Sequence, residues 1–75
     1  MKVLAFGKIA EIVGNQEIEI DNLPNTEVLL GYLRQQYPQL QNMKFTLAVN
    51  KKQVSGNTEI PRGAEVALLP PFSGG

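Results

Sequence analysis

The sequence has no cysteine and no histidine, and these absences exclude most kinds of side-chain catalysis. Without cysteine there is no disulfide, no thiolate nucleophile and no cysteine-based metal site. Without histidine there is no imidazole base and no Ser-His-Asp arrangement. The acidic residues lack metal-loop spacing, and the glycines fit neither the dinucleotide nor the P-loop spacing. We therefore expect no catalytic residue, no metal and no bound cofactor in this chain.

Excess charge and long apolar runs are also missing. Seven basic and seven acidic residues cancel without forming a basic patch, so the electrostatic footprint of nucleic-acid binding is lacking. No apolar stretch is long enough to cross a bilayer, and the run after Lys2 is too short for a signal-peptide core. We expect a cytoplasmic protein that has neither nucleic acid nor a membrane as a partner.

What the 75 residues do contain is a series of short β-type segments, which fits one small domain with a modest core. Alternating polar and apolar residues, or short apolar runs, predict strands over residues 2–6, 16–20, 45–49, 53–54 and 65–69. In the last of these, Val66 and Leu68 are predicted to face the core. Residues 50–52 are predicted to form a turn.

Two segments have helical spacing. Apolar residues within 8–13 predict a short helix that stops at Gly14. A longer helix of about 11 residues is predicted to begin at Asn25 or Thr26, either of which can cap it, and to end near Tyr37, which precedes a proline. The predicted core-facing stripe of the longer helix consists of Val28, Leu29, Tyr32 and Leu33.

This order of elements predicts an α+β fold. One main helix laid across one face of a mixed sheet is typical of a β-grasp (ubiquitin-like) roll. A ferredoxin-like sandwich needs a second long helix, and no helical period follows Phe45. We expect a β-grasp domain over residues 1–69 and an extended tail over residues 70–75.

The first and last strands carry apolar residues on the side that the helix does not cover. Leu4 and Phe6 share one side of the first strand, and Ala67 and Leu69 share one side of the last. If these strands are neighbours, the four side chains form an apolar patch, and such patches often mark partner surfaces. Scattered exposed apolar residues are the alternative, since these are normal. We predict that Leu4, Phe6, Ala67 and Leu69 bind a partner.

The sequence finishes on two prolines followed by a glycine pair. Glycine has no Cβ, so Gly74 and Gly75 can pass through a narrow slot. The prolines favour an extended path away from the domain. A frayed end or a cloning remnant is the alternative explanation. We predict a tail that inserts into a partner through Pro70, Pro71, Phe72, Ser73 and Gly74, with the carboxylate of Gly75 as its reactive group.

Three segments resemble the MoaD-type sulfur carriers, which are the small subunits of molybdopterin synthase. They are residues 2–14, the stretch Leu47-Ala48-Val49-Asn50 followed by Val54, and residues 63–75 with the specific ending Pro-Pro-x-x-Gly-Gly. The resemblance covers nearly the whole chain. It implies a β-grasp fold in which the first and last strands are adjacent and parallel at the centre of the sheet.

The resemblance also implies a chemistry for Gly75. An E1-like adenylyltransferase would use ATP to adenylate the Gly75 carboxylate, and a sulfur donor enzyme would convert it to a thiocarboxylate. The tail would then enter the large subunit of molybdopterin synthase, within a heterotetramer. There it would donate sulfur to the cyclic pyranopterin precursor in molybdenum cofactor biosynthesis. On this interpretation the chain is a non-catalytic, sulfur-donating subunit of a sulfurtransferase.

Three other functions stay open at this point. The chain could be the sulfur carrier of another pathway, such as thiamine synthesis, cysteine synthesis or tRNA modification. It could be a ubiquitin-like modifier whose Gly75 forms isopeptide bonds with target lysines, or an interaction domain with an inert tail. The proline pair and the segment 8–13 after the first strand favour the molybdopterin branch.

Overall fold

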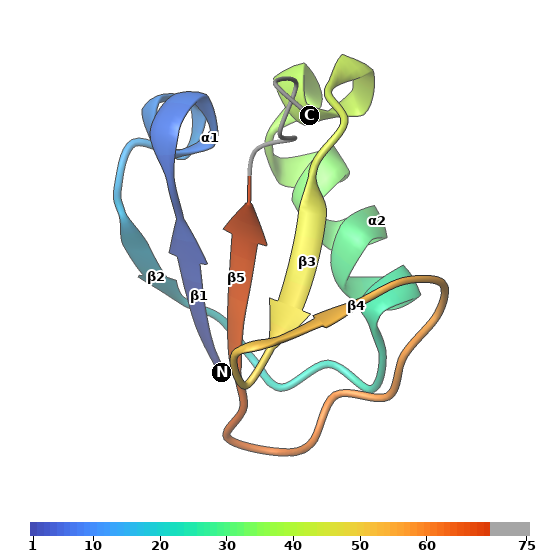
Figure 1. Ribbon diagram of the computed structural model, residues 1–75. Coiled ribbons are helices and arrows are strands. Elements are labelled where there is room, and N and C mark those ends of the chain that lie inside the picture. The colour runs from blue at the N-terminus through green and yellow to red at the C-terminus, as the bar shows by residue number, and fades with distance from the viewer. Residues whose placement is uncertain (70–75) are drawn as a thin grey trace.

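A mixed sheet of 5 strands organises the protein, as the computed structural model of the chain shows (Figure 1). The structure describes residues 1–69. Along the chain, the elements are β1 (Lys2–Ala5), α1 (Gly7–Val13), β2 (Glu17–Glu19), α2 (Thr26–Gln36), the 3-10 helix η1 (Pro38–Asn42), β3 (Thr46–Val49), β4 (Lys52–Val54) and β5 (Glu65–Leu69). The strand order is β2-β1-β5-β3-β4. β1 and β5 pair in parallel at the centre, and the other neighbours are antiparallel.

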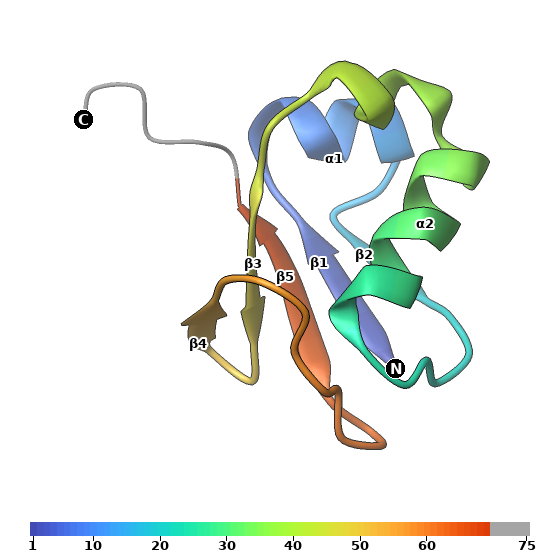
Figure 2. The same ribbon diagram turned by 90° about the vertical axis from the view of Figure 1, so that its right-hand side faces the viewer.

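The helices cover one face of this sheet, and the core lies between the two layers (Figure 2). Successive side chains of a strand point to opposite faces, so every second residue of β1 and β5 enters the core. The side chains that are at most 1% exposed are Val3, Ala5, Ile9, Leu29, Leu33, Leu40, Val66 and Leu68. The predicted α+β β-grasp architecture is confirmed, including the inward positions of Val66 and Leu68.

The short helix α1 closes one end of the core. It follows β1 directly, and its N-cap residue Phe6 has an extended backbone conformation. Gly14 ends it in the left-handed conformation at φ 90°, and its N–H donates to the Ala10 carbonyl at 2.8 Å. A residue with a Cβ is disfavoured in that conformation, which is why glycine stops the helix here. The prediction for this segment is confirmed, with the start one residue earlier.

The long helix α2 has the predicted boundaries but a different buried face. Leu29 and Leu33 are fully buried, whereas Val28 and Tyr32 are 44% and 37% exposed, so the prediction that these two face the core is wrong. The buried line of α2 instead begins at Thr26 and continues in steps of three and four to Leu29 and Leu33. Two neighbouring stripes of the helix have the spacing of a core-facing side. Only packing against the sheet selects which of them is buried.

The start of α2 is fastened to the loop before β5. Thr26 is 2% exposed, and its hydroxyl donates to the Gly56 carbonyl at 3.2 Å and accepts from the Thr58 N–H at 2.9 Å. The Glu27 N–H donates to the Asn57 side-chain carbonyl at 3.1 Å. The last of these bonds satisfies a backbone N–H that a helix start otherwise leaves without a partner. The loop and the helix therefore hold each other in place.

The hairpin between β3 and β4 turns on two non-glycine residues with positive φ. Asn50 and Lys51 have φ values of 50° and 71°, as a tight two-residue hairpin turn requires. The Asn50 side-chain carbonyl accepts from the Glu65 N–H at 3.0 Å, and the Asn50 N–H donates to the Glu65 carbonyl at 2.7 Å. The turn therefore also fixes where β5 begins. Lys52 was predicted in this turn and belongs to β4 instead.

The 3-10 helix η1 was not predicted. Proline at its first position fits a helix start, and Leu40 within it is fully buried against the core. Such short helices leave almost no periodic signal in a sequence. In residues 1–69, no helix is long and apolar enough to span a bilayer.

Replacing Thr26 with valine tests the loop-to-helix attachment. Valine keeps the shape but removes both hydroxyl hydrogen bonds, leaving the Thr58 N–H and the Gly56 carbonyl without that partner. We expect Thr26→Val to lower the free energy of unfolding in urea by about 1–3 kcal/mol. Thr46→Val, at a half-buried strand position, is the matched control and should change it by less than about 0.5 kcal/mol. Equal effects of the two variants would contradict this role for the hydroxyl.

Candidate functional site

The face of the sheet opposite the helices is the first candidate for a functional surface. No helix within residues 1–69 covers it (Figure 2). On this face, Leu4 of β1 and Ala67 and Leu69 of β5 are half-buried, while their neighbours in the strands are buried in the core. We call the four residues Leu4, Phe6, Ala67 and Leu69 the open-face patch.

The strand register brings the members of the open-face patch together. Leu4 lies opposite Ala67 in the parallel β1–β5 pair. Phe6 follows the end of β1 at the level where β5 reaches Leu69, and it is 44% exposed. The predicted patch required the first and last strands to be neighbours, and the structure shows that they are. The partner-binding role of these residues stays a prediction.

Sequence reasoning missed one residue of this face. Ala48 of β3 lies opposite Ala67 on one side and Gln53 of β4 on the other, so it extends the apolar row to a third strand. It is 6% exposed, although alternation along β3 places it on the side opposite the helices. Its position between Leu47 and Val49 in the alternating pattern was the available signal.

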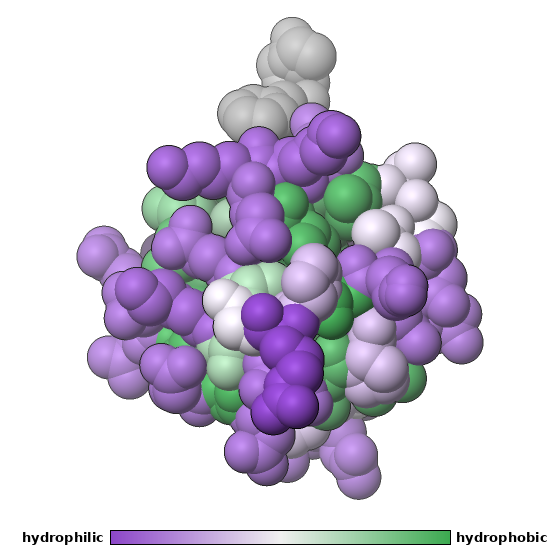
Figure 3. Space-filling view, turned by 90° about the horizontal axis from the view of Figure 1, so that it is seen from below, coloured by the Kyte–Doolittle hydropathy of each residue, from purple (hydrophilic) through white to green (hydrophobic). Residues whose placement is uncertain are grey.

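The face becomes charged toward the end where β1 and β5 begin. Lys2 lies opposite Glu19 and Glu65, and its ammonium is 3.9 Å from the Glu17 carboxylate. Both partners of that ion pair are largely exposed, so it contributes little to stability. Viewed from this end, the molecule is covered mostly by hydrophilic residues (Figure 3). The apolar part of the face therefore lies near the end where β5 finishes.

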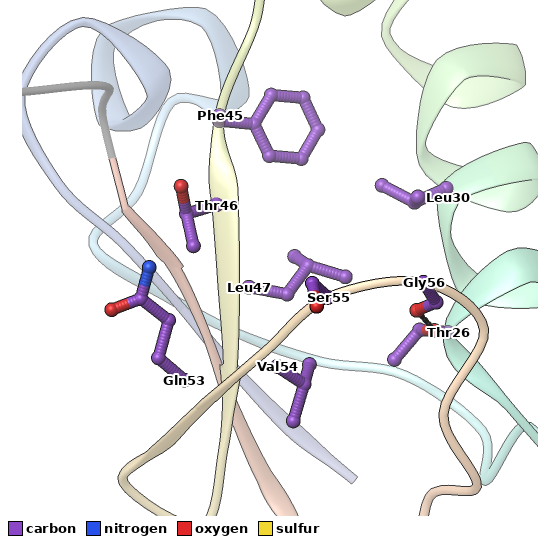
Figure 4. Close-up of a pocket in the computed structure, with 9 residues that line it drawn as sticks. All are labelled: Thr26, Leu30, Phe45, Thr46, Leu47, Gln53, Val54, Ser55 and Gly56. Carbon is purple, nitrogen blue, oxygen red and sulfur yellow. Dashed lines mark hydrogen bonds between the residues drawn. The ribbon is translucent and has the colours of Figure 1, made fainter.

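A second candidate is a cleft of about 320 Å³ between α2 and the β3–β4 hairpin (Figure 4). Phe45 and Leu47 point toward Leu30 of α2 across this cleft, whereas Thr46 and Gln53 point away from it. The cleft is therefore on the opposite side of β3 from the open-face patch. Its lining contains no ionisable side chain, being formed by Thr26, Leu30, Phe45, Thr46, Leu47, Gln53, Val54, Ser55 and Gly56. It can receive an apolar group but supplies no acid or base.

A metal centre needs several ligating side chains close together. Among residues 1–69, no three His, Cys, Asp or Glu side chains are grouped so that they could hold a metal ion. The predicted tail residues Pro70, Pro71, Phe72, Ser73, Gly74 and Gly75 lie outside the described residues. What the structure does show is their point of departure, which is Leu69 at the end of a central strand and within the open-face patch.

The fold defines the class of protein, which is a ubiquitin-like β-grasp protein. A putative molybdopterin converting factor subunit 1 from Pyrococcus furiosus superposes with a TM-score of 0.80 at 22% identity, covering 95% of both chains. Small archaeal modifier protein 1 from Methanosarcina acetivorans superposes with a TM-score of 0.81 at 21% identity, covering 99% of this chain and 94% of that one. At such identities the likeness concerns the fold alone.

Sequence comparison adds the family. The model of the ThiS family matches residues 3–75. The molybdopterin synthase sulfur carrier subunit of Dictyostelium discoideum is 37% identical, over 99% of this chain and 94% of that protein. The subunit of the same name from Escherichia coli strain K12 is 34% identical, over 100% of this chain and 99% of that protein. The chain belongs to the ThiS family, and the predicted resemblance to sulfur carriers is confirmed.

The two faces of the sheet should differ in how much they contribute to stability. Leu68 is fully buried on the helix side, and Leu68→Ala should lower the free energy of unfolding by about 2–5 kcal/mol because it leaves a cavity. Phe6→Ala, on the open face, should cost less than about 1 kcal/mol, because the side chain is already 44% exposed. Urea denaturation of both variants measures the difference. A loss for Phe6→Ala as large as for Leu68→Ala would place Phe6 in the core.

Proposed function

We propose that this protein is a sulfur carrier and acts as the small subunit of a molybdopterin synthase. The observation that carries the proposal is similarity over the full length to sulfur carrier subunits, at 37% and 34% identity for the two relatives named above. The alignments reach 94% and 99% of those proteins, so they include nearly their whole length.

The proposed chemistry takes place at the carboxylate of Gly75. An E1-like adenylyltransferase transfers the adenylyl group of ATP to this carboxylate, and pyrophosphate leaves. A sulfur donor enzyme then supplies sulfur at the oxidation level of sulfide, which attacks the acyl carbon, so that AMP leaves and a thiocarboxylate results. Activation is needed because a carboxylate is a poor acyl donor until one of its oxygens belongs to a good leaving group. The thiocarboxylate donates its sulfur to the cyclic pyranopterin precursor; its bond between carbon and sulfur breaks, and water restores the Gly75 carboxylate.

The fold supports this role by anchoring the base of the tail. β5 has a neighbour on each side, β1 and β3, and its pairing with β3 extends to Leu69 opposite Thr46. The residue before Pro70 is therefore held by the sheet. Because the sequence has neither histidine nor cysteine and no glycine-rich phosphate loop, we assign the acid, base and nucleotide-binding groups of the reaction to the partners.

We assign the open-face patch to partner binding. It is apolar, lies on the uncovered face and includes Leu69, from which the tail departs. Three partners follow from the proposed chemistry: the large synthase subunit, with which the chain forms a heterotetramer, the adenylyltransferase and the sulfur donor. Because the reaction consumes ATP, we propose a cytoplasmic location.

Other sulfur-carrier pathways and protein modification start from the same tail chemistry. The similarity to small archaeal modifier proteins is at 21–22% identity and supports the fold, not a modifier role. The relatives above 30% identity named here are molybdopterin synthase subunits, which favours that pathway. Co-purification with a thiamine-synthesis enzyme instead of a synthase large subunit would replace the proposed pathway by that one.

Deleting Gly75 tests the proposed reactive group. The deletion should abolish sulfur transfer in an assay with the large subunit and the precursor, because the activated carboxylate would be one residue short. The melting temperature should stay the same, because the domain over residues 1–69 is untouched. Intact mass of the native protein should show the gain from replacing one oxygen by sulfur, and the deletion variant should lack it. Sulfur transfer by the deletion variant would contradict the carrier role.

The binding role of the open-face patch can be tested with two exposed aromatic residues. Phe6 and Tyr32 are 44% and 37% exposed, but Phe6 is in the patch and Tyr32 is on the outer side of α2. Phe6→Ala should weaken binding of the large subunit by about 2 kcal/mol or more, as interface anchors do, and Leu69→Asp should act similarly. Tyr32→Ala should leave the affinity unchanged. Titration calorimetry measures all three, and equal effects of Phe6→Ala and Tyr32→Ala would refute the assignment.

A further inference from the structure

Two exposed lysines flank the end of β5. Lys8 is the second residue of α1, which follows β1, and Lys44 lies two residues before β3. Since β1 is parallel to β5 and β3 is antiparallel to it, the end of β1 and the start of β3 lie at the end of the sheet where β5 finishes. Figure 1 shows α1 on one side of that strand end and the approach to β3 on the other.

Neither lysine has an acidic partner in the described part of the chain. The ion pairs there join the amino terminus to Glu19 and Lys2 to Glu17, both near β2. In the segments that surround the end of β5, residues 7–13 and 37–45, Glu11 is the one acidic residue. The remaining side-chain carboxylates belong to Glu17, Glu19, Asp21, Glu27, Glu59 and Glu65. Among the described residues of these segments, Lys8 and Lys44 therefore outnumber the carboxylate of Glu11, although the side-chain charges of the whole chain cancel.

We propose that Lys8 and Lys44 bind carboxylates on the surface of the large subunit and orient the tail during association. This inference rests on the proposed function. Exposed charges without partners act over several ångströms and accelerate encounter with an oppositely charged surface. Lys8 is two residues from Phe6, and Lys44 is two residues from Thr46, which lies opposite Leu69. A charged rim around an apolar centre is the usual composition of a protein interface.

The tail determines the sign of charge that the partner must present. A site that receives an anionic chain end needs positive groups inside it, and those groups repel Lys8 and Lys44. Acidic residues at the mouth of that site offset the repulsion and hold the two lysines at the rim. The partner surface is therefore acidic outside and basic inside, and the carrier has the complementary arrangement.

Charge reversal at the two ends of the molecule tests the proposal. Lys8→Glu/Lys44→Glu changes the tail end, and Lys52→Glu/Arg62→Glu changes exposed residues at the opposite end, so both double variants have the same net charge. Association with the large subunit is followed by stopped-flow at several salt concentrations. At about 0.1 M salt, we expect the first variant to associate roughly tenfold more slowly than the unaltered protein. At about 1 M salt, where screening is strong, the two association rates should be similar. The association rate of the second variant should stay within about twofold of the rate of the unaltered protein.

The outcomes separate this inference from the proposed function. Equal slowing of both double variants, or no slowing of the first, would overturn the role of the lysines while leaving sulfur transfer intact. Failure of the unaltered protein to bind the large subunit would overturn both. Lys8→Gln/Lys44→Gln should give an intermediate rate at low salt. Melting temperatures of all variants should agree, because the four side chains are exposed.

Discussion

The parallel pairing of β1 with β5 is the constraint on which the rest of the structure depends. It joins residues 2–5 to residues 65–68, which lie at opposite ends of the described chain, and it forms the centre of the sheet. The pair buries Val3 and Val66 under the helices. It also places the end of β5 between β1 and β3, so the departure point of the tail belongs to the stable centre of the fold and not to an edge.

The register of this pair links stability to binding. Val66 and Leu68 belong to the core, and Ala67 and Leu69, which alternate with them, belong to the open face. A slip of one residue would exchange the two sets, exposing the core residues and burying the proposed binding surface. The same hydrogen bonds that stabilise the domain therefore keep Leu4 beside Ala67. The proposed binding surface therefore needs no structural element of its own.

The neutral composition conceals a separation of charge. Because the antiparallel β3 starts where β5 ends, Lys44 is placed near the same end of the sheet as Lys8, with most carboxylates elsewhere. The open face repeats this polarity, with Lys2 and Glu65 at one end and Phe6 and Leu69 at the other. Apolar and basic residues thus share the end of the sheet where β5 finishes, which fits the proposed binding of a partner there.

The sequence by itself determined the elements whose signals are local. Asn25 and Pro38 bound α2, Gly14 ends α1, and alternation alone located β5 and its inward residues. The ending of the chain and its resemblance to sulfur carriers were also readable without coordinates. The tertiary structure decided which stripe of α2 is buried, since Val28 and Tyr32 fit the helical period as well as Thr26 does. It also decided that Leu4 adjoins Ala67 and that Lys8 and Lys44 flank one strand end. These arrangements involve segments that are distant in the sequence. The local pattern of residues does not specify which strands become neighbours, because the packing of the sheet decides it.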